Sequence, residues 1–171
     1  MNTPYFLRED ARASIEIFDA EEVPTAVIKR NDFPMQDMRM LFDEGLSALF
    51  PAISKRSVKP AGPVFSLHHR MPTKTTDLEV GLPIDAPFSG QIDAGEDFII
   101  EPSVMPAGKV AAISHVGPYA GLPGAWGSFM QKLAADGHRI GVPFWEVYLT
   151  EPGPDVDPET LRTDLYVLLE D

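Results

Sequence analysis

The fold is decided by a stretch that occurs twice, as AVIKRND at residues 26–32 and as AAISHVG at residues 111–117. Two further pairs of stretches follow in the same order. PVFSLHH at 63–69 resembles PFWEVYL at 143–149, and DLEVGL at 77–82 resembles DLYVLL at 164–169. Internal repetition in a constant order is a guide to architecture, so the sequence predicts two related halves.

Each half is expected to have the same order of elements. Alternating apolar residues rich in Val, Ile and Thr predict strands at 14–18, 23–29, 63–70, 76–83, 98–105, 109–116, 144–150 and 164–169. Apolar residues at helical spacing predict one helix that opens at Phe33–Pro34 and is limited by Pro51. A second helix is expected from Leu122, with Gly137 as its stop.

The predicted fold class is therefore α+β. It consists of a duplicated β-α-β-β unit (two SHS2-like units) with an antiparallel sheet, two main helices on one face and a ligand groove between the halves. We predict a single domain over residues 1–171. Its first repeat is expected at about 14–83 and its second at about 98–171. The linker at about 84–97 is rich in Pro, Gly, Asp and Ser.

Composition excludes several classes of function. The chain has no cysteine, which rules out disulfides, thiolate metal sites and cysteine nucleophiles. Its net charge of −12 repels phosphate backbones, so direct nucleic-acid binding is not expected. No run of about 18 apolar residues occurs, so we expect a cytoplasmic protein without a membrane segment. No cofactor is expected either, while a protein partner or a homodimer stays open.

The histidines do not form a metal site in the sequence. His68 and His69 are neighbours on a strand, so their side chains point to opposite faces and cannot chelate one ion. His115 and His138 have no second ligand at a suitable spacing. The sequence therefore predicts no metal. Ser114 also lacks the Gly-x-Ser-x-Gly elbow of a serine hydrolase.

Strand 144–150 carries the strongest candidate for a binding site. Alternation places Phe144, Glu146 and Tyr148 on one face and the apolar residues between them on the other. We expect the apolar set to pack against the helices and Glu146 to face an open groove on the other side. A carboxylate between aromatic rings attracts a cation by charge and through the ring faces, and desolvation should raise its pKa.

Two motifs resemble those of a known family. They are the turn His115-Val-Gly-Pro-Tyr119 and the strand Trp145-Glu-Val-Tyr-Leu-Thr-Glu-Pro152. Together they resemble the GyrI-like small-molecule-binding domain, which is also the effector-binding part of AraC- and MerR-type multidrug-sensing regulators. The resemblance covers the chain from about Ser14 onwards. It implies a bacterial protein with a duplicated β-α-β-β fold and a central apolar groove. In that groove a glutamate, here Glu146, meets cationic or polar ligands.

The sequence offers no upstream helix-turn-helix, so the resemblance points to a stand-alone member. We expect it to bind amphipathic, cationic or aromatic small molecules, for sensing, sequestration or resistance. The expected ligand-binding residues are Glu146, Tyr148, Tyr119, Tyr166, Phe144, His68 and Trp126.

Two alternatives stay open at this point. Some GyrI-like proteins that this chain resembles hydrolyse strained, cyclopropane-type DNA-alkylating compounds, and Glu146, Tyr148 or Tyr119 would then be catalytic. A glutamate beside a tyrosine could orient water as a general base. The third reading is an interaction protein similar to a DNA gyrase inhibitor. Whether the chain is an enzyme is therefore undecided by its sequence.

Overall fold

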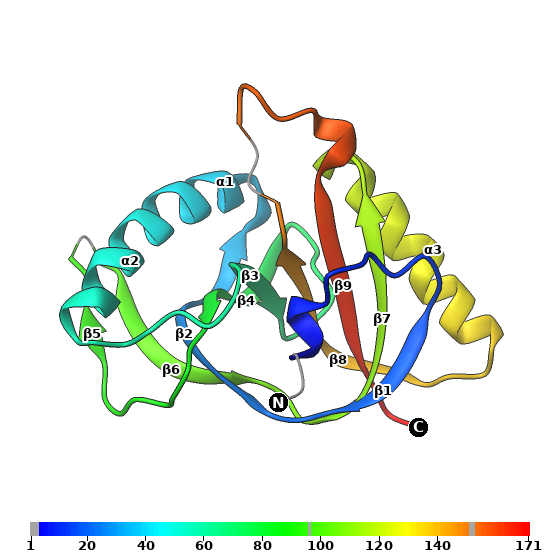
Figure 1. The fold of residues 1–171 in the computed structure, drawn as a ribbon, viewed down its shortest axis with the longest axis horizontal. Coiled ribbons are helices and arrows are strands. Elements are labelled where there is room, and N and C mark those ends of the chain that lie inside the picture. The colour runs from blue at the N-terminus through cyan, green and yellow to red at the C-terminus, as the bar shows by residue number, and fades with distance from the viewer. Residues whose placement is uncertain (1–3, 96, 151–152) are drawn as a thin grey trace. The chain divides into compact units, whose positions relative to one another are not determined.

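The computed structural model describes residues 4–95, 97–150 and 153–171 (Figure 1). Contacts along the chain divide it into two compact units. Unit 1 is built from two segments, Met1–Glu21 and Ala107–Asp171, whereas unit 2 is the continuous stretch Glu22–Pro106.

Unit 2 is an antiparallel sheet with one long helical segment. Its strands, in the spatial order β3-β4-β2-β6-β5, are β3 (Phe65–His68), β4 (Thr75–Pro83), β2 (Val23–Pro34), β6 (Ile99–Met105) and β5 (Ile92–Asp93). The helical segment consists of a 3-10 turn at Met35–Asp37, α1 (Met38–Met40), a π-helical turn at Leu41–Gly45 and α2 (Leu46–Lys55). Leu41, Leu49 and Ile53 of this segment are buried against the sheet.

The first predicted helix needs two corrections. Phe33 and Pro34 end strand β2, where they pair with Thr76 and Thr75, so the helical segment begins one residue later. Pro51 does not limit the helix, because α2 continues through it to Lys55. A proline inside a helix removes one backbone hydrogen bond. The burial of Leu49, Ala52 and Ile53 on either side of Pro51 outweighs that loss.

Unit 1 is an antiparallel sheet of four strands covered by one helix. The strands, in the order β1-β7-β9-β8, are β1 (Glu16–Ala20), β7 (Gly108–Val116), β9 (Arg162–Leu169) and β8 (Ile140–Tyr148). Three 3-10 turns lie at Tyr5–Leu7, Tyr119–Gly121 and Pro158–Thr160. The helix α3 (Leu122–Ala135) ends just before Gly137, whose φ of 86° is the left-handed conformation expected of a helix stop.

Both units contain the same order of elements, β2-α2-β3-β4 in unit 2 and β7-α3-β8-β9 in unit 1. The stretches that resemble each other in the sequence therefore occupy equivalent strands. The predicted α+β class, with duplicated β-α-β-β units and antiparallel pairing, is confirmed. The ligand groove between the halves stays a prediction.

The compact units do not follow the two sequence halves. Strand β1 comes from the first half of the chain but pairs with β7 in unit 1. Strand β6 comes from the second half but pairs with β2 in unit 2. The first strand of each sequence half is therefore paired in the unit that is otherwise built from the other half. The predicted repeat and linker boundaries describe a division of the sequence and stay a prediction.

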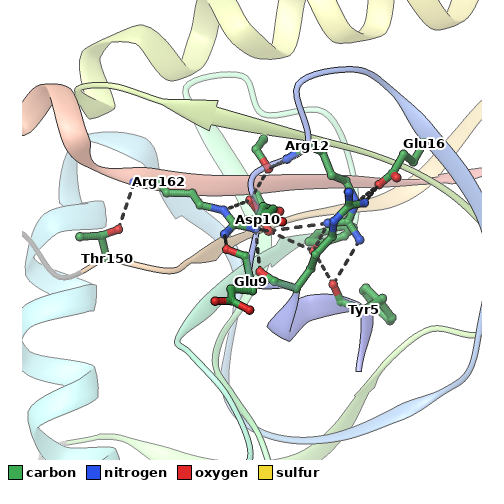
Figure 2. Close-up of polar contacts among 11 residues, drawn as sticks. Tyr5, Glu9, Asp10, Arg12, Glu16, Thr150 and Arg162 are labelled. Atoms are coloured by element: carbon green, nitrogen blue, oxygen red, sulfur yellow. Dashed lines mark hydrogen bonds and ion pairs between the residues drawn. The ribbon is translucent and has the colours of Figure 1, made fainter. Parts of the chain in front are cut away.

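The N-terminal segment, residues 4–14, packs on the face of the unit 1 sheet that is opposite α3. The Tyr5 ring lies 5.2 Å from the ring of Tyr166, and the Tyr5 carbonyl accepts a hydrogen bond from Arg12 (Figure 2). Arg162 binds three more carbonyls of the segment, those of Arg8, Glu9 and Asp10. Two arginine side chains thus hold this segment through its backbone.

Asp164 is the anion at the centre of these contacts, and it is fully buried. It accepts hydrogen bonds from Ser114 at 2.7 Å and from both Nε and Nη2 of Arg162 at 3.0 and 2.9 Å. Arg12 Nη1 lies 3.7 Å from its second oxygen. The negative charge of Asp164 is therefore balanced by two guanidinium groups.

Candidate functional site

Strand β8 presents Glu146 to helix α3. Phe144 of this strand packs in the core with Phe129 and Leu133 of α3, and Glu146 lies two residues further along the same face. The prediction that Glu146 faces away from the helix is therefore wrong. Trp145, which was expected against the helix, is fully buried on the opposite face.

The reversed assignment has a physical reason. The face opposite α3 is not open, because Trp145 stacks on Tyr166 there, with 5.7 Å between ring centroids, and Tyr166 in turn contacts Tyr5. When both faces of a strand are covered, alternation separates two sets of residues without identifying the set that meets the helix.

Glu146 accepts one hydrogen bond on each carboxylate oxygen. Trp126 of α3 donates its indole N–H to Oε2 at 3.1 Å, and the hydroxyl of Tyr148 donates to Oε1 at 3.0 Å. Burial raises the pKa of Glu146, while these two hydrogen bonds and the nearby His115 oppose the shift. The result is a carboxyl group that holds its proton to higher pH than an exposed glutamate would.

Aromatic rings surround this carboxylate. The ring of Trp126 meets that of Phe144 edge-on at 4.9 Å, and the ring of Tyr119 meets that of Tyr148 in the same manner at 6.0 Å. Tyr119 is 37% exposed. Burial and the adjacent Glu146 raise its pKa. We call Glu146, Trp126, Tyr148, Tyr119 and Phe144 the Glu146 site.

His115, which is not among the expected ligand-binding residues, also lies near Glu146. Its Nε2 donates to the carbonyl of Pro118 at 3.0 Å, which fixes the turn that carries Tyr119. A Cβ at Gly121 would stand 2.9 Å from the His115 ring, so the imidazole is packed tightly into the turn. The motif His115-Val-Gly-Pro-Tyr119 contains this histidine, but its spacing alone excludes a metal site without indicating that His115 positions the turn.

Tyr166 does not join the Glu146 site, because it lies on the opposite face of the unit 1 sheet. Its hydroxyl accepts a hydrogen bond from Arg12 at 3.2 Å, and burial raises its pKa. This tyrosine contributes to the packing of the N-terminal segment.

His68 belongs to unit 2. It stands on β3 at the position that Tyr148 takes on β8, and its Nδ1 is 2.7 Å from the hydroxyl oxygen of Thr76. Burial lowers its pKa to about 4, so it carries no charge at neutral pH.

Within residues 4–95, 97–150 and 153–171, no group of three or more His, Asp or Glu side chains is arranged to hold a metal ion. No helix in the described part of the chain has the length and apolar character needed to cross a membrane.

Comparison with known proteins assigns the family. The model of the GyrI-like small-molecule-binding domain matches residues 15–170, and therefore includes both motifs singled out in the sequence. Glu151 and Pro152, at the end of the second motif, lie outside the described residues. No match was found among individually curated proteins.

Solved structures share the fold at low sequence identity. The C-terminal domain of EcmrR superposes with a TM-score of 0.74 at 17% identity, over 92% of this chain and 98% of that one. A hydrolase from Listeria innocua gives 0.59 at 14% identity, over 95% and 94%. SAV2435 bound to tetraphenylphosphonium gives 0.60 at 8% identity, over 92% and 94%. The chain belongs to the family of GyrI-like small-molecule-binding domains.

Proposed function

We propose that this chain binds amphipathic small molecules that carry a positive charge on an apolar or aromatic body, and that Glu146 neutralises this charge. The observation that carries the proposal is the setting of Glu146: a half-buried carboxylate held by Trp126 and Tyr148, with aromatic rings around it. Such binding would serve sensing, sequestration or resistance.

The chemistry of the site favours a lipophilic cation. Each carboxylate oxygen has accepted one hydrogen bond and keeps a further lone pair for a ligand. Ring faces near a desolvated cation add about 2 kcal/mol to the Coulomb attraction. The net charge of −12 attracts cations to the protein as a whole. Tetraphenylphosphonium, with which SAV2435 was solved, has this combination of charge and aromatic surface.

The test is calorimetric titration with tetraphenylphosphonium. The native chain should bind it, and Glu146→Gln should weaken binding by about tenfold or more, since a factor of ten corresponds to about 1.4 kcal/mol. Affinity should also rise with pH through the raised pKa of Glu146, because the proton and the cation compete for the same carboxylate.

The matched control is Glu159→Gln, which removes one negative charge at an exposed position that is not part of the Glu146 site. It should leave the affinity and its pH dependence unchanged. Equal affinities of the native chain and Glu146→Gln would remove the carboxylate from the binding site.

A second function, hydrolysis of strained electrophilic compounds, is favoured by one contact. Tyr148 donates to Glu146, and burial raises the pKa of this carboxyl, which makes its anion a stronger base than an exposed glutamate. In this reaction Glu146 takes a proton from water while the water oxygen attacks a ring carbon. The strained carbon–carbon bond then breaks towards an electron-accepting group, which takes up a proton. The neighbour from Listeria innocua bears the name of a hydrolase.

Mass spectrometry distinguishes this reaction from simple binding. If the chain is a hydrolase, a cyclopropane-type electrophile should gain one water molecule in its presence, and Glu146→Gln should abolish the product. Recovery of unreacted compound after incubation with the native chain would reject this activity and leave the binding proposal intact.

A further inference from the structure

A cavity of about 570 Å³ lies in unit 1 along the flank of α3 that faces β1 and β7. The surface of its walls is mostly apolar, and the apolar residues that contribute to it are Ile15, Ile17, Ile113, Ala125, Phe129 and Leu133. Ile17 is 38% exposed. The described structure thus leaves apolar surface in contact with water along this flank.

This cavity is separate from the Glu146 site. The α3 residues that line it include Ala125, Ser128 and Lys132, which follow one side of the helix at spacings of three and four residues. Trp126, which binds Glu146, is not among the lining residues, and neither are Tyr119, Tyr148 and Phe144. One helix therefore contributes to two different sites, one on each flank.

Four of the polar side chains that line the cavity already have partners. Lys132 pairs with Asp136 at 3.2 Å, and His138 Nδ1 lies 2.7 Å from a carboxylate oxygen of Asp171. Ser114 donates to Asp164 at 2.7 Å. Because Lys132 and Asp136 balance each other, the described wall of the cavity offers a charged occupant no unpaired counter-ion. The cavity is therefore suited to an occupant without net charge.

We infer that this cavity is a second small-molecule site, which takes an uncharged, largely apolar molecule the size of two or three rings. A volume of about 570 Å³ lies in the range of cavities that hold small organic ligands. Such a molecule removes the exposed part of Ile17 and the walls of the cavity from water, which is favourable in proportion to the apolar area covered. The inference does not depend on the function proposed for Glu146.

The test uses the full chain and N-phenyl-1-naphthylamine, an uncharged probe whose fluorescence rises in apolar surroundings. The native chain should bind one equivalent saturably. Ser128→Phe places a ring in the cavity from an exposed position of α3, and it should weaken binding by tenfold or more. Gln131→Phe adds the same ring at an exposed α3 position that does not line the cavity, and it should bind as the native chain does.

A second variant and a competition experiment complete the test. Ile17→Ser shortens one wall on the edge strand β1 and should weaken binding several-fold. Glu146→Gln and an excess of tetraphenylphosphonium should leave probe binding unchanged. The inference is overturned if no saturable binding occurs, or if Ser128→Phe and Gln131→Phe bind equally. The inference is also overturned if tetraphenylphosphonium displaces the probe and Glu146→Gln weakens probe binding. The probe would then occupy the Glu146 site.

Discussion

Asp164→Asn should lower the free energy of unfolding by about 3–5 kcal/mol, the usual cost of removing one partner of a buried ion pair. Asp164 is fully buried between Arg12 and Arg162, and the side chain of Arg12 is only 4% exposed. Asparagine keeps the shape but removes the charge, so Arg162 loses its carboxylate partner, whereas Arg12 keeps Glu16 at 2.6 Å. Urea unfolding measures the loss as a lower midpoint.

The same variant should loosen the N-terminal segment before it unfolds the whole chain. Asp164 holds the guanidinium group of Arg162 in place. Without this anchor, Arg162 can no longer bind the carbonyls of Arg8, Glu9 and Asp10. Amide hydrogen exchange in residues 4–14 should therefore accelerate first. Asp19→Asn, an exposed carboxylate on β1, is the control and should change stability by less than about 0.5 kcal/mol. An equally small change in Asp164→Asn would contradict this account.

Gly81→Ala should be destabilising by about 3 kcal/mol, the upper end of the usual cost of overpacking. Gly81 lies on β4, opposite Val27 on one neighbouring strand and Phe65 on the other. A Cβ there would stand 2.0 Å from the carbonyl oxygen of Ala26 and 2.8 Å from the Cα of Val27. These are backbone atoms, which cannot rotate away, so β2 and β4 would have to separate.

Gly127→Ala should have the opposite effect on the stability of the protein. Gly127 lies in α3, and a Cβ at this position meets nothing within 4 Å. Alanine is the better helix former by about 1 kcal/mol, so this variant should be more stable than the native chain. Thermal unfolding of both variants gives the comparison. If Gly81→Ala melts at the native temperature, β2 and β4 do not approach each other as closely as described.

The order of elements could be predicted from the sequence because it depends on local patterns. Alternation located the strands other than β5, which lies in the predicted linker, while helical spacing located α3 and Gly137 marked its end. The path of the chain around Pro51 could not be predicted, because the apolar contacts of Leu49 and Ile53 that keep α2 intact are tertiary. The assignment of β1 to unit 1 depends on its pairing with β7, which is distant in sequence and leaves no local signal.

Most residues of the Glu146 site could be predicted from the sequence, but the face of the sheet on which they lie could not. A carboxylate between Phe144 and Tyr148 is visible in the sequence, and Trp126 and Tyr119 were recognised as candidates beside it. The face they occupy depends on what covers the other side of the sheet. There Tyr5 and Arg12 pack against Tyr166, more than 150 residues further along the chain. A single sequence contains no local sign of that contact.

Unit 1 is built from two separate segments of the chain, which affects the order in which the protein folds during synthesis. Strand β1 and the N-terminal segment leave the ribosome before unit 2 does, but their partner strands β7 and β9 are synthesised after unit 2 is complete. Unit 2 can therefore fold on the nascent chain before β1 and the N-terminal segment have partner strands. Strand β1 is therefore translated before unit 2 but finds its partner strand after it, and a chain released prematurely after unit 2 would leave β1 exposed to proteases.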